Sequence, residues 1–251
     1  MNGRIPFQRL HNFRDLGGRP ADDGRTVRTG RLFRADSLAK LGGADWERFL
    51  ALDIGTVIDL RHSWEIDAKG RVPVHPSFTY HHLSVEHRPY DQPSLGPDVA
   101  AGPYLAERYL EVAHDGVGEL SRAVEVIAAA GERPAVFHCT SGKDRTGLLA
   151  ALVLTLLGVS EADIIADFAL TGLASERLLA DWRAEHPGAG PIWPGYGRAP
   201  EDVMRLFLAA LTERYGSVRG YIADRLDIED DVVAALRRNL LEAAPATGPQ
   251  P

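Results

Sequence analysis

Cysteine is nearly absent from the sequence, since Cys139 is the only one among 251 residues. A single thiol cannot build an internal disulfide framework or a cysteine-rich zinc site, and it is typical of a protein in a reducing compartment. The amino terminus also lacks the uninterrupted apolar core of a secretory signal. We therefore expect a cytoplasmic protein, while export by a route without such a signal stays open.

Positive charge is not in excess, and long hydrophobic runs are missing. The 28 lysines and arginines face 35 acidic residues, which gives a formal net charge of -7. This balance argues against nucleic acid as a partner and leaves room only for a local basic pocket. The most apolar run, Leu148 to Leu157, is about half of the roughly 20 residues that cross a bilayer. We expect a buried helix there and no transmembrane segment.

The hydrophobic content of 45% is enough for one sizeable core. We expect a single domain over residues 1–244, followed by a disordered tail at 245–251. Within the domain, residues 171–215 are a candidate helical lid. They include the Gly/Pro-rich stretch HPGAGPIWPGYGRAP, which is either a mobile cover or a surface loop with aromatic anchors.

Strands and helices alternate in the first part of the chain, as in an α/β fold. Apolar and β-branched runs predict strands at 54–60 and 135–139, with a helix at 44–52 and a mostly helical region at 104–130. A helix follows Arg145, and further helices are expected at 161–170, 175–185, 201–215 and 229–242. Because ligands of open α/β sheets bind beyond the carboxyl ends of strands, Arg61 and Cys139 are expected to share one pocket.

The most informative segment is HCTSGKDRTG at 138–147, where a thiol stands between a strand and a helix. A helix amino terminus, nearby cations and inward-pointing amides all lower the pKa of a thiol. Cys139 is therefore expected to be a nucleophilic thiolate at neutral pH. Thr146 is placed to hydrogen-bond the sulfur when it leaves, and His138 is expected to order the loop.

The residues after the cysteine suit a phosphoryl group. Backbone amides from Thr140, Ser141, Gly142 and Lys143 onward can form a concave nest for phosphoryl oxygens, and glycine permits a close approach. Arg145 adds a planar, permanently charged fork that holds two oxygens. Lys143 is either a second cation at the mouth of this cradle or a solvated surface lysine.

Asp144 lies beside the expected phosphate, where a dianion repels a carboxylate. It either carries a proton as a general acid or turns away to hold a neighbouring arginine. A nucleotide-binding Walker loop does not fit this segment, since Phe137 stands where that motif has its first glycine and Asp144 replaces its serine or threonine. No G-x-S-x-G elbow of a serine hydrolase is present.

The segment resembles the signature of the cysteine-dependent protein tyrosine phosphatases, which is His-Cys, five residues, Arg, then Ser or Thr. The order of five blocks is similar to that of the bacterial tyrosine/serine phosphatases: HNFRDLGG at 11–18, GRLFRADSL at 30–38, TVIDLRHSWE at 56–65, HCTSGKDRTG at 138–147 and ERYGSVRGYI at 213–222. The resemblance implies a phosphatase-type central sheet flanked by helices, with a carboxyl-terminal helical lid or extension. It also implies hydrolysis through a phosphocysteine with no metal and no cofactor.

The same resemblance implies the substrate class. Relatives of this kind accept phosphotyrosine, and some also accept phosphoserine, phosphothreonine or phosphoinositides. Lys143 matches the Gly-Lys-x-Arg cradle of lipid phosphatases. A phosphorylated protein or a phosphoinositide is therefore the expected partner, whereas the sequence does not indicate an oligomeric state.

One departure from the tyrosine phosphatase pattern concerns the general acid. The Trp-Pro-Asp tripeptide that carries this acid in the best-known enzymes is missing. The comparable segment, LSVEHRPYD at 83–91, offers Glu86 and Asp91. In the bacterial group the aspartate beside the arginine has a proposed role, so the resemblance ranks Asp144 first, Glu86 second and Asp91 third.

Other polar clusters have two interpretations each. Four histidines without the spacing of a metal site are more simply strand and loop residues: His75, His81, His82 and His87. Four charged residues are either an ion-pair network that braces the cradle or a remote structural set: Arg14, Asp15, Asp59 and Arg61. Asn12 is a candidate to bond a loop backbone.

Two other functions compete with a phosphatase. A pseudophosphatase would bind a phosphorylated partner without turnover, but the intact Cys139 and Arg145 favour an enzyme. A sulfurtransferase or arsenate reductase also uses a cysteine in an anion-binding loop. Arsenate reduction ordinarily needs further thiols, which this chain does not have.

Overall fold

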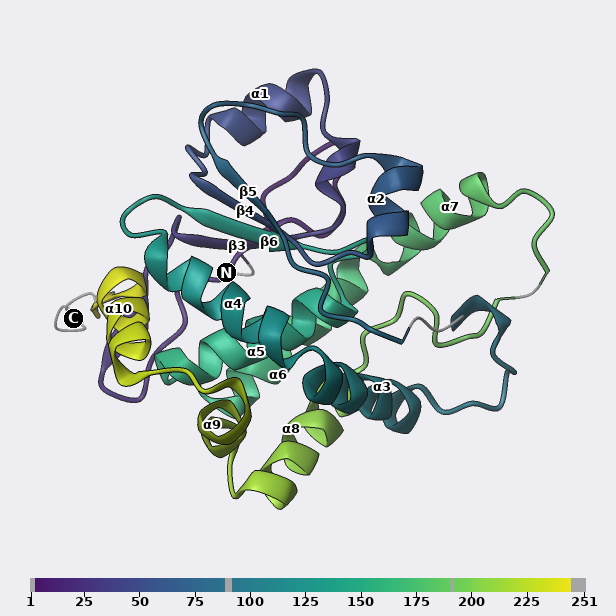
Figure 1. Cartoon of the computed structure of the whole chain (residues 1–251). Coiled ribbons are helices and arrows are strands. Elements are labelled where there is room, and N and C mark those ends of the chain that lie inside the picture. The colour runs from purple at the N-terminus through teal and green to yellow at the C-terminus, as the bar shows by residue number, and fades with distance from the viewer. Residues whose placement is uncertain (1–2, 89–91, 191, 245–251) are drawn as a thin grey trace, which may run out of the picture.

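A five-stranded sheet lies between two layers of helices in the computed structural model, which describes residues 3–88, 92–190 and 192–244 (Figure 1). The strand order is β1-β3-β6-β4-β5, with β1 antiparallel to β3 and the other four strands parallel. The strands are β1 (Arg14–Asp15), β3 (Leu32–Ala35), β6 (Ala135–His138), β4 (Thr56–Asp59) and β5 (Thr79–His82). The predicted α/β class is confirmed, and the predicted tail at 245–251 lies outside the described residues.

Alternating side chains explain why this sheet is covered on both faces. On β4, Val57 packs into one buried cluster and Ile58 into another. On β6, Val136 and Phe137 divide in the same way. The two predicted strands are therefore confirmed, each buried on both sides, and β6 lies at the centre of the sheet.

The helices form two unequal layers. The smaller layer contains α1 (Ala44–Leu50) and α2 (Ser63–Lys69) (Figure 1). The larger one contains α3 (Ala101–Asp115), α4 (Val117–Ala129), α5 (Asp144–Leu157), α6 (Glu161–Ala169), α8 (Glu201–Tyr215), α9 (Val218–Tyr221) and α10 (Asp230–Leu240). The region expected to be mostly helical is two helices, divided at Gly116, where an added Cβ would lie 2.2 Å from the Val85 carbonyl oxygen.

Helix α5 is buried along almost its whole length, as its apolar run predicts. Its residues from Thr146 to Leu154 are all buried, and it ends at Gly158 with a left-handed φ of 83°. Among the residues that the structure describes, no helix combines the length and the apolar character needed to cross a membrane.

A small second sheet was not expected from the sequence. Strand β2 (Arg25–Val27) pairs antiparallel with β7 (Leu241–Ala243), so a segment near the amino terminus holds one near the carboxyl terminus. The helix predicted to reach residue 242 ends at Leu240 because the following residues join this pair.

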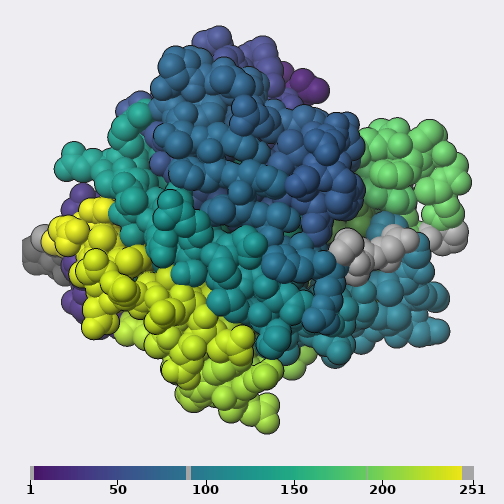
Figure 2. Space-filling view, in the orientation of Figure 1, coloured from purple at the N-terminus to yellow at the C-terminus, as the bar shows by residue number. Residues whose placement is uncertain are grey.

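The candidate lid, 171–215, contains two different environments. Helix α7 (Ser175–Glu185) has no buried residue and projects from the side of the molecule (Figures 1 and 2). Helix α8 instead packs against α3 and places five side chains in the core: Val203, Met204, Phe207, Leu208 and Leu211. In the stretch between them, Trp193 is a buried anchor whose Nε1 donates to the Val99 carbonyl at 2.9 Å.

Candidate active site

The loop after β6 lies at the carboxyl edge of the central strand. Strand β6 ends at His138, Cys139 follows, and α5 begins at Asp144. Asp59 at the end of β4 is the register partner of His138, so Arg61 and Cys139 lie at the same edge, as predicted. The thiol residue is only 1% exposed. The nucleophile predicted from the sequence is therefore placed at the base of the loop, next to a helix amino terminus.

The loop backbone is held from outside through its carbonyl groups. Asn12 Nδ2 donates to the carbonyls of Ser141 and Gly142, each at 3.0 Å, as expected for this residue. Arg34 Nη2 donates to the Gly142 carbonyl at 2.8 Å. Because the N–H and C=O of a peptide point in opposite directions, carbonyls held outward turn the following amides inward. Gly142 itself has a φ of +66°, and an added Cβ would lie 2.5 Å from the Ala35 carbonyl oxygen.

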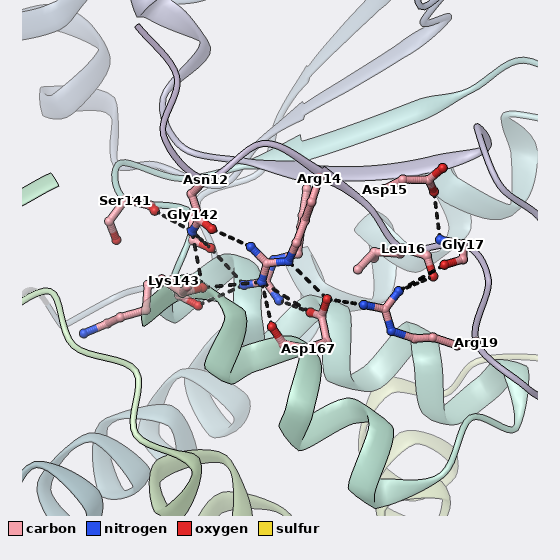
Figure 3. Close-up of polar contacts among 12 residues, drawn as sticks. Asn12, Arg14, Asp15, Leu16, Gly17, Arg19, Ser141, Gly142, Lys143 and Asp167 are labelled. Carbon is pink, nitrogen blue, oxygen red and sulfur yellow. Dashed lines mark hydrogen bonds and ion pairs between the residues drawn. The ribbon is translucent and has the colours of Figure 1, made fainter. Parts of the chain in front are cut away.

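Asp167 of α6 is the centre of the network behind the loop. Figure 3 shows Arg14 and Arg19 converging on this carboxylate, with Asn12 turned toward Ser141 and Gly142. The carboxylate oxygens of Asp167 lie 3.1 Å from Arg14 Nε, 2.5 Å from Arg19 Nη2 and 2.6 Å from Arg34 Nη1. Burial opposes ionisation, but the three guanidinium groups hold the pKa of Asp167 well below its usual range. One ionised carboxylate thus fixes the arginine that holds the loop.

Asp59 organises a second network on the other side of the cradle. Its carboxylate accepts from Arg61 Nη2 at 2.6 Å and from the Tyr80 hydroxyl at 3.0 Å, while His138 Nε2 lies 3.5 Å away. Burial opposes its ionisation, yet His138 and Arg61 hold the pKa of Asp59 well below its usual range. His138 Nδ1 lies 3.3 Å from the Cys139 carbonyl oxygen, which fits the predicted role in ordering the loop.

The single ion-pair network suggested by the sequence was wrong in its composition. Arg14 belongs to the Asp167 cluster, and Asp59 with Arg61 forms a separate cluster. Asp15 belongs to neither, because its carboxylate accepts from the backbone amides of Gly17 and Gly30. Two networks therefore support the loop from opposite sides.

Glu65 of α2 holds the arginine of the signature. Its Oε2 lies 2.5 Å from Arg145 Nη1, its Oε1 lies 3.1 Å from Arg145 Nη2, and the Thr140 hydroxyl also donates to it. Burial alone would raise the pKa of Glu65, but the hydrogen bonds and charge of Arg145 lower it to about 2. Burial also opposes the charge of Arg145, whereas the neighbouring Cys139 and Glu65 raise the pKa of its guanidinium.

Sequence reasoning missed Glu65. It stands three residues after His62, whose backbone amide donates to its carboxylate at 2.8 Å. A glutamate three residues after the N-cap is the pattern of a capping box, and the block TVIDLRHSWE ends on this residue, but neither signal points to Arg145. The same carboxylate both caps α2 and positions Arg145.

Two of the three general-acid candidates lie at the site, and Asp91 lies outside the described residues. Glu86 Oε2 is 3.4 Å from Arg145 Nε and 3.3 Å from His62 Nε2. Burial, assisted by the charges of Asp144 and Glu65, raises the pKa of Glu86 to about 7 against the opposing effect of Arg145.

Asp144 has a different setting, in the first turn of α5. Its Oδ1 accepts from the Tyr109 hydroxyl at 2.9 Å and lies 3.3 Å from Lys143 Nζ. The side chain of Lys143 is only 1% exposed, so the alternative of a solvated surface lysine was wrong. Thr146 is also buried, in the first turn of the same helix.

Three of the four histidines considered for a metal site have other side-chain contacts. His75 bonds Ser77 at 2.8 Å, His82 Nε2 bonds the Arg61 carbonyl at 2.8 Å, and His87 lies 3.3 Å from Glu119. Within residues 3–88, 92–190 and 192–244, no group of three or more His, Cys, Asp or Glu side chains is arranged to hold a metal ion.

Comparison of the whole sequence with known proteins identifies the family of the chain. The sequence profile of the tyrosine phosphatase family matches residues 5–242. A tyrosine-protein phosphatase of Nostoc commune is 28% identical over 234 residues, covering 89% of this chain and 79% of its own. The triple specificity protein phosphatase PtpB of Mycobacterium tuberculosis is 30% identical over 255 residues, covering 85% and 90% of the two chains.

One further relative is similar over most of its sequence, whereas the similarity to a solved structure is weak. A Cupriavidus necator protein named provisionally as a tyrosine-protein phosphatase is 31% identical over 252 residues, which cover 94% of this chain and 88% of its own. A solved structure of TpbA from P. aeruginosa in complex with pTyr covers 74% of this chain and 89% of its own, at 18% identity and a TM-score of 0.31. The match of the family profile over nearly the whole sequence confirms the predicted class: the chain belongs to the tyrosine phosphatase family.

Proposed function

We propose that this protein hydrolyses phosphotyrosine through a phosphocysteine intermediate on Cys139. The observation that carries the proposal is the arrangement of the loop from Cys139 to Arg145: the thiol is buried, Asn12 and Arg34 hold the loop carbonyls, and Glu65 fixes the guanidinium. These are the parts that a phosphoryl group with three anionic oxygens requires. The family membership of the chain supports the same chemistry.

The reaction has two steps in which bonds and protons balance. The Cys139 thiolate attacks phosphorus, the S–P bond forms, the bond from phosphorus to the tyrosine oxygen breaks, and a carboxylic acid protonates that oxygen. Water then attacks the phosphocysteine, the S–P bond breaks, and the same carboxylate takes a proton from the water. Inorganic phosphate and free thiolate result.

Each predicted binding residue has a place in this scheme. The amides of Thr140, Ser141, Gly142 and Lys143 cradle the phosphoryl oxygens. The guanidinium of Arg145 binds two of them and stabilises the charge that spreads over them in the transition state. These assignments rest on the loop geometry described above.

Two further side chains act on the ends of the loop. The hydroxyl of Thr146 assists departure of the sulfur in the second step, and His138 keeps the loop in register with β6. The wider substrate range, phosphoserine, phosphothreonine and phosphoinositides, is supported by the name of the mycobacterial relative and by the buried cation of Lys143 beside the cradle. The single thiol supports a cytoplasmic location.

The test is the release of phosphate by the wild type and by Cys139→Ser, with a chelator present. The substrates are a phosphotyrosine peptide, a phosphoserine peptide and a soluble phosphoinositide. Turnover that the chelator leaves intact and the substitution abolishes supports the cysteine mechanism, and the preferred substrate defines the class. Binding of all three without turnover favours a pseudophosphatase, and neither binding nor turnover would contradict the account of the cradle.

A further inference from the structure

We infer that Glu86, and not Asp144, is the acid that protonates the leaving oxygen, an assignment that rests on the proposed function. Glu86 follows β5 in the chain and lies at the same edge of the sheet as the cradle, with only 8% of its surface exposed. Its carboxyl group reaches the signature arginine, at 3.4 Å from Arg145 Nε. A group at this nitrogen is within reach of a phosphoryl group held by the same guanidinium.

Two glutamates contact one arginine from different elements, and their environments differ. Glu65 binds both terminal nitrogens of Arg145, accepts from Thr140, and has a pKa lowered to about 2. It is therefore ionised at every physiological pH and serves as the fixed counter-ion. Glu86 meets Arg145 only at Nε, and burial raises its pKa to about 7. Paired carboxyl groups with separated pKa values are the usual basis for dividing an acid role from an anionic one.

In the part of the chain that the structure describes, the charged groups around Glu86 come from α5 and from α2 with its N-cap residue. From α5 they are Arg145, which opposes protonation, and Asp144, which favours it. From α2 comes Glu65, which favours protonation, and the N-cap of this helix is His62, whose Nε2 lies 3.3 Å from Glu86 Oε2. Burial and the charge of Arg145 lower the pKa of His62, so this imidazole is neutral near pH 7 and does not supply the charge that would ionise Glu86.

Asp144 is engaged in a way that suits a structural carboxylate. Its Oδ1 accepts from the Tyr109 hydroxyl and faces the ammonium group of Lys143. An oxygen that already accepts from a hydroxyl and faces a cation is held by those groups. This contact holds the buried side chain of Lys143, which makes Asp144 a positioning residue and leaves the proton to Glu86.

The test compares Glu86→Gln with Asp144→Asn on two aryl phosphates whose leaving groups differ in basicity. A general acid contributes about 100-fold or more when the leaving group is basic. For Glu86→Gln we expect kcat/KM, which reports the steps up to departure of the aryl group, to fall about 100-fold on phenyl phosphate and less than about 10-fold on p-nitrophenyl phosphate, whose leaving group needs little protonation. Asp144→Asn is expected to lower kcat/KM on both substrates by the same factor.

The pH profile is a second readout that a structural role would not move. The fall of kcat/KM on phenyl phosphate above about pH 7, the pKa of Glu86 in the free protein, should be lost in Glu86→Gln. Glu86→Asp should restore part of the rate on phenyl phosphate. Equal losses on both substrates in Glu86→Gln, or a selective loss in Asp144→Asn, would overturn the assignment. If Cys139→Ser retained turnover, the proposed function itself would fail, which is a separate result.

Discussion

The carboxylate of Glu65 holds both terminal nitrogens of Arg145, although the two residues are 80 positions apart in the sequence. Arg145 has therefore a fixed orientation before any substrate binds. We expect Glu65→Gln to reduce kcat/KM on phosphotyrosine by about 100-fold, because misplacing a binding group by about 1 Å has an effect of this size. Steady-state kinetics measure it, and Glu47→Gln, an exposed change in α1, is the matched control.

The Asp167 cluster predicts a large effect on stability. Asp167→Asn leaves three buried or nearly buried guanidinium groups without their counter-ion, and breaking a buried ion pair on one side costs about 3–5 kcal/mol. Chemical denaturation should show this loss in the free energy of unfolding. The control is Glu201→Gln, whose exposed pair with Arg205 is worth about 0.5 kcal/mol at most. Equal losses in the two variants would contradict the role of the cluster.

The close approach of the cradle to β3 predicts that Gly142 tolerates no side chain. In Gly142→Ala the new methyl group would meet the Ala35 carbonyl oxygen at 2.5 Å, and the φ of +66° would add strain. We expect loss of both activity and phosphate binding. Gly118→Ala is the control, because this helical glycine in α4 has nothing within 4 Å of the added atom. That variant should keep its activity and gain about 0.5–1 kcal/mol of stability.

Protonation of Glu86 predicts how stability depends on pH. The pKa of Glu86 in the folded protein, about 7, lies above the ordinary value of 4.5, so the folded state binds this proton more tightly than the unfolded chain. The resulting stability is complete below about pH 4.5 and is lost as the pH rises through about 7, for a change of about 3 kcal/mol. Unfolding of the wild type and Glu86→Gln should therefore differ in slope between pH 5 and 7, and parallel curves would count against the raised pKa.

Helix α7 is held by ion pairs that salt can screen. Asp181 lies 2.7 Å from Lys40 Nζ and 3.1 Å from His11 Nε2, and Glu185 lies 2.5 Å from Lys69 Nζ. The Debye length is about 3 Å at 1 M salt and about 10 Å at 0.1 M, so these ion pairs are weaker at the higher concentration. If residues 171–215 include a moving lid, proteolysis there should therefore be faster at 1 M salt than at 0.1 M.

A substitution and a ligand complete the test of α7. Asp181→Asn should reproduce the effect of salt, whereas a change at Glu176, an exposed residue of the same helix, should not. A phosphate analogue such as vanadate should alter the cleavage pattern. Identical cleavage across 171–215 under all these conditions would speak against a moving lid.

The sequence predicted those parts of the site that are contiguous in the chain. From Cys139 to Thr146 the thiol, the amides and the guanidinium follow one another, so their covalent order alone brings them together. Glu65 could not be found in this way. It is one of 35 acidic residues, and its partner is fixed only when α2 and α5 meet at one edge of the sheet.

Long-range pairing explains the other differences as well. Asp167 and Arg14 are 153 residues apart, so their pairing depends on how α6 crosses behind the cradle. Strands β2 and β7 have only three residues each, too few for an alternating pattern to stand out from a loop or a helix end. Helices with a long apolar face, such as α5 and α8, were predicted within one or two residues of their bounds because local periodicity defines them.

Because Cys139 is the only thiol in the chain, the enzyme has no internal means of recovery from oxidation. A sulfenic acid formed at this position finds no neighbouring cysteine with which to condense into a disulfide. A cyclic bond between the sulfur and a backbone nitrogen of the loop would protect the sulfur without reducing it, so reactivation must in either case come from a diffusing thiol such as glutathione. Cys139 is also the only site in the sequence for thiol-directed reagents. Any such reagent that labels the intact chain therefore reports on the catalytic loop alone.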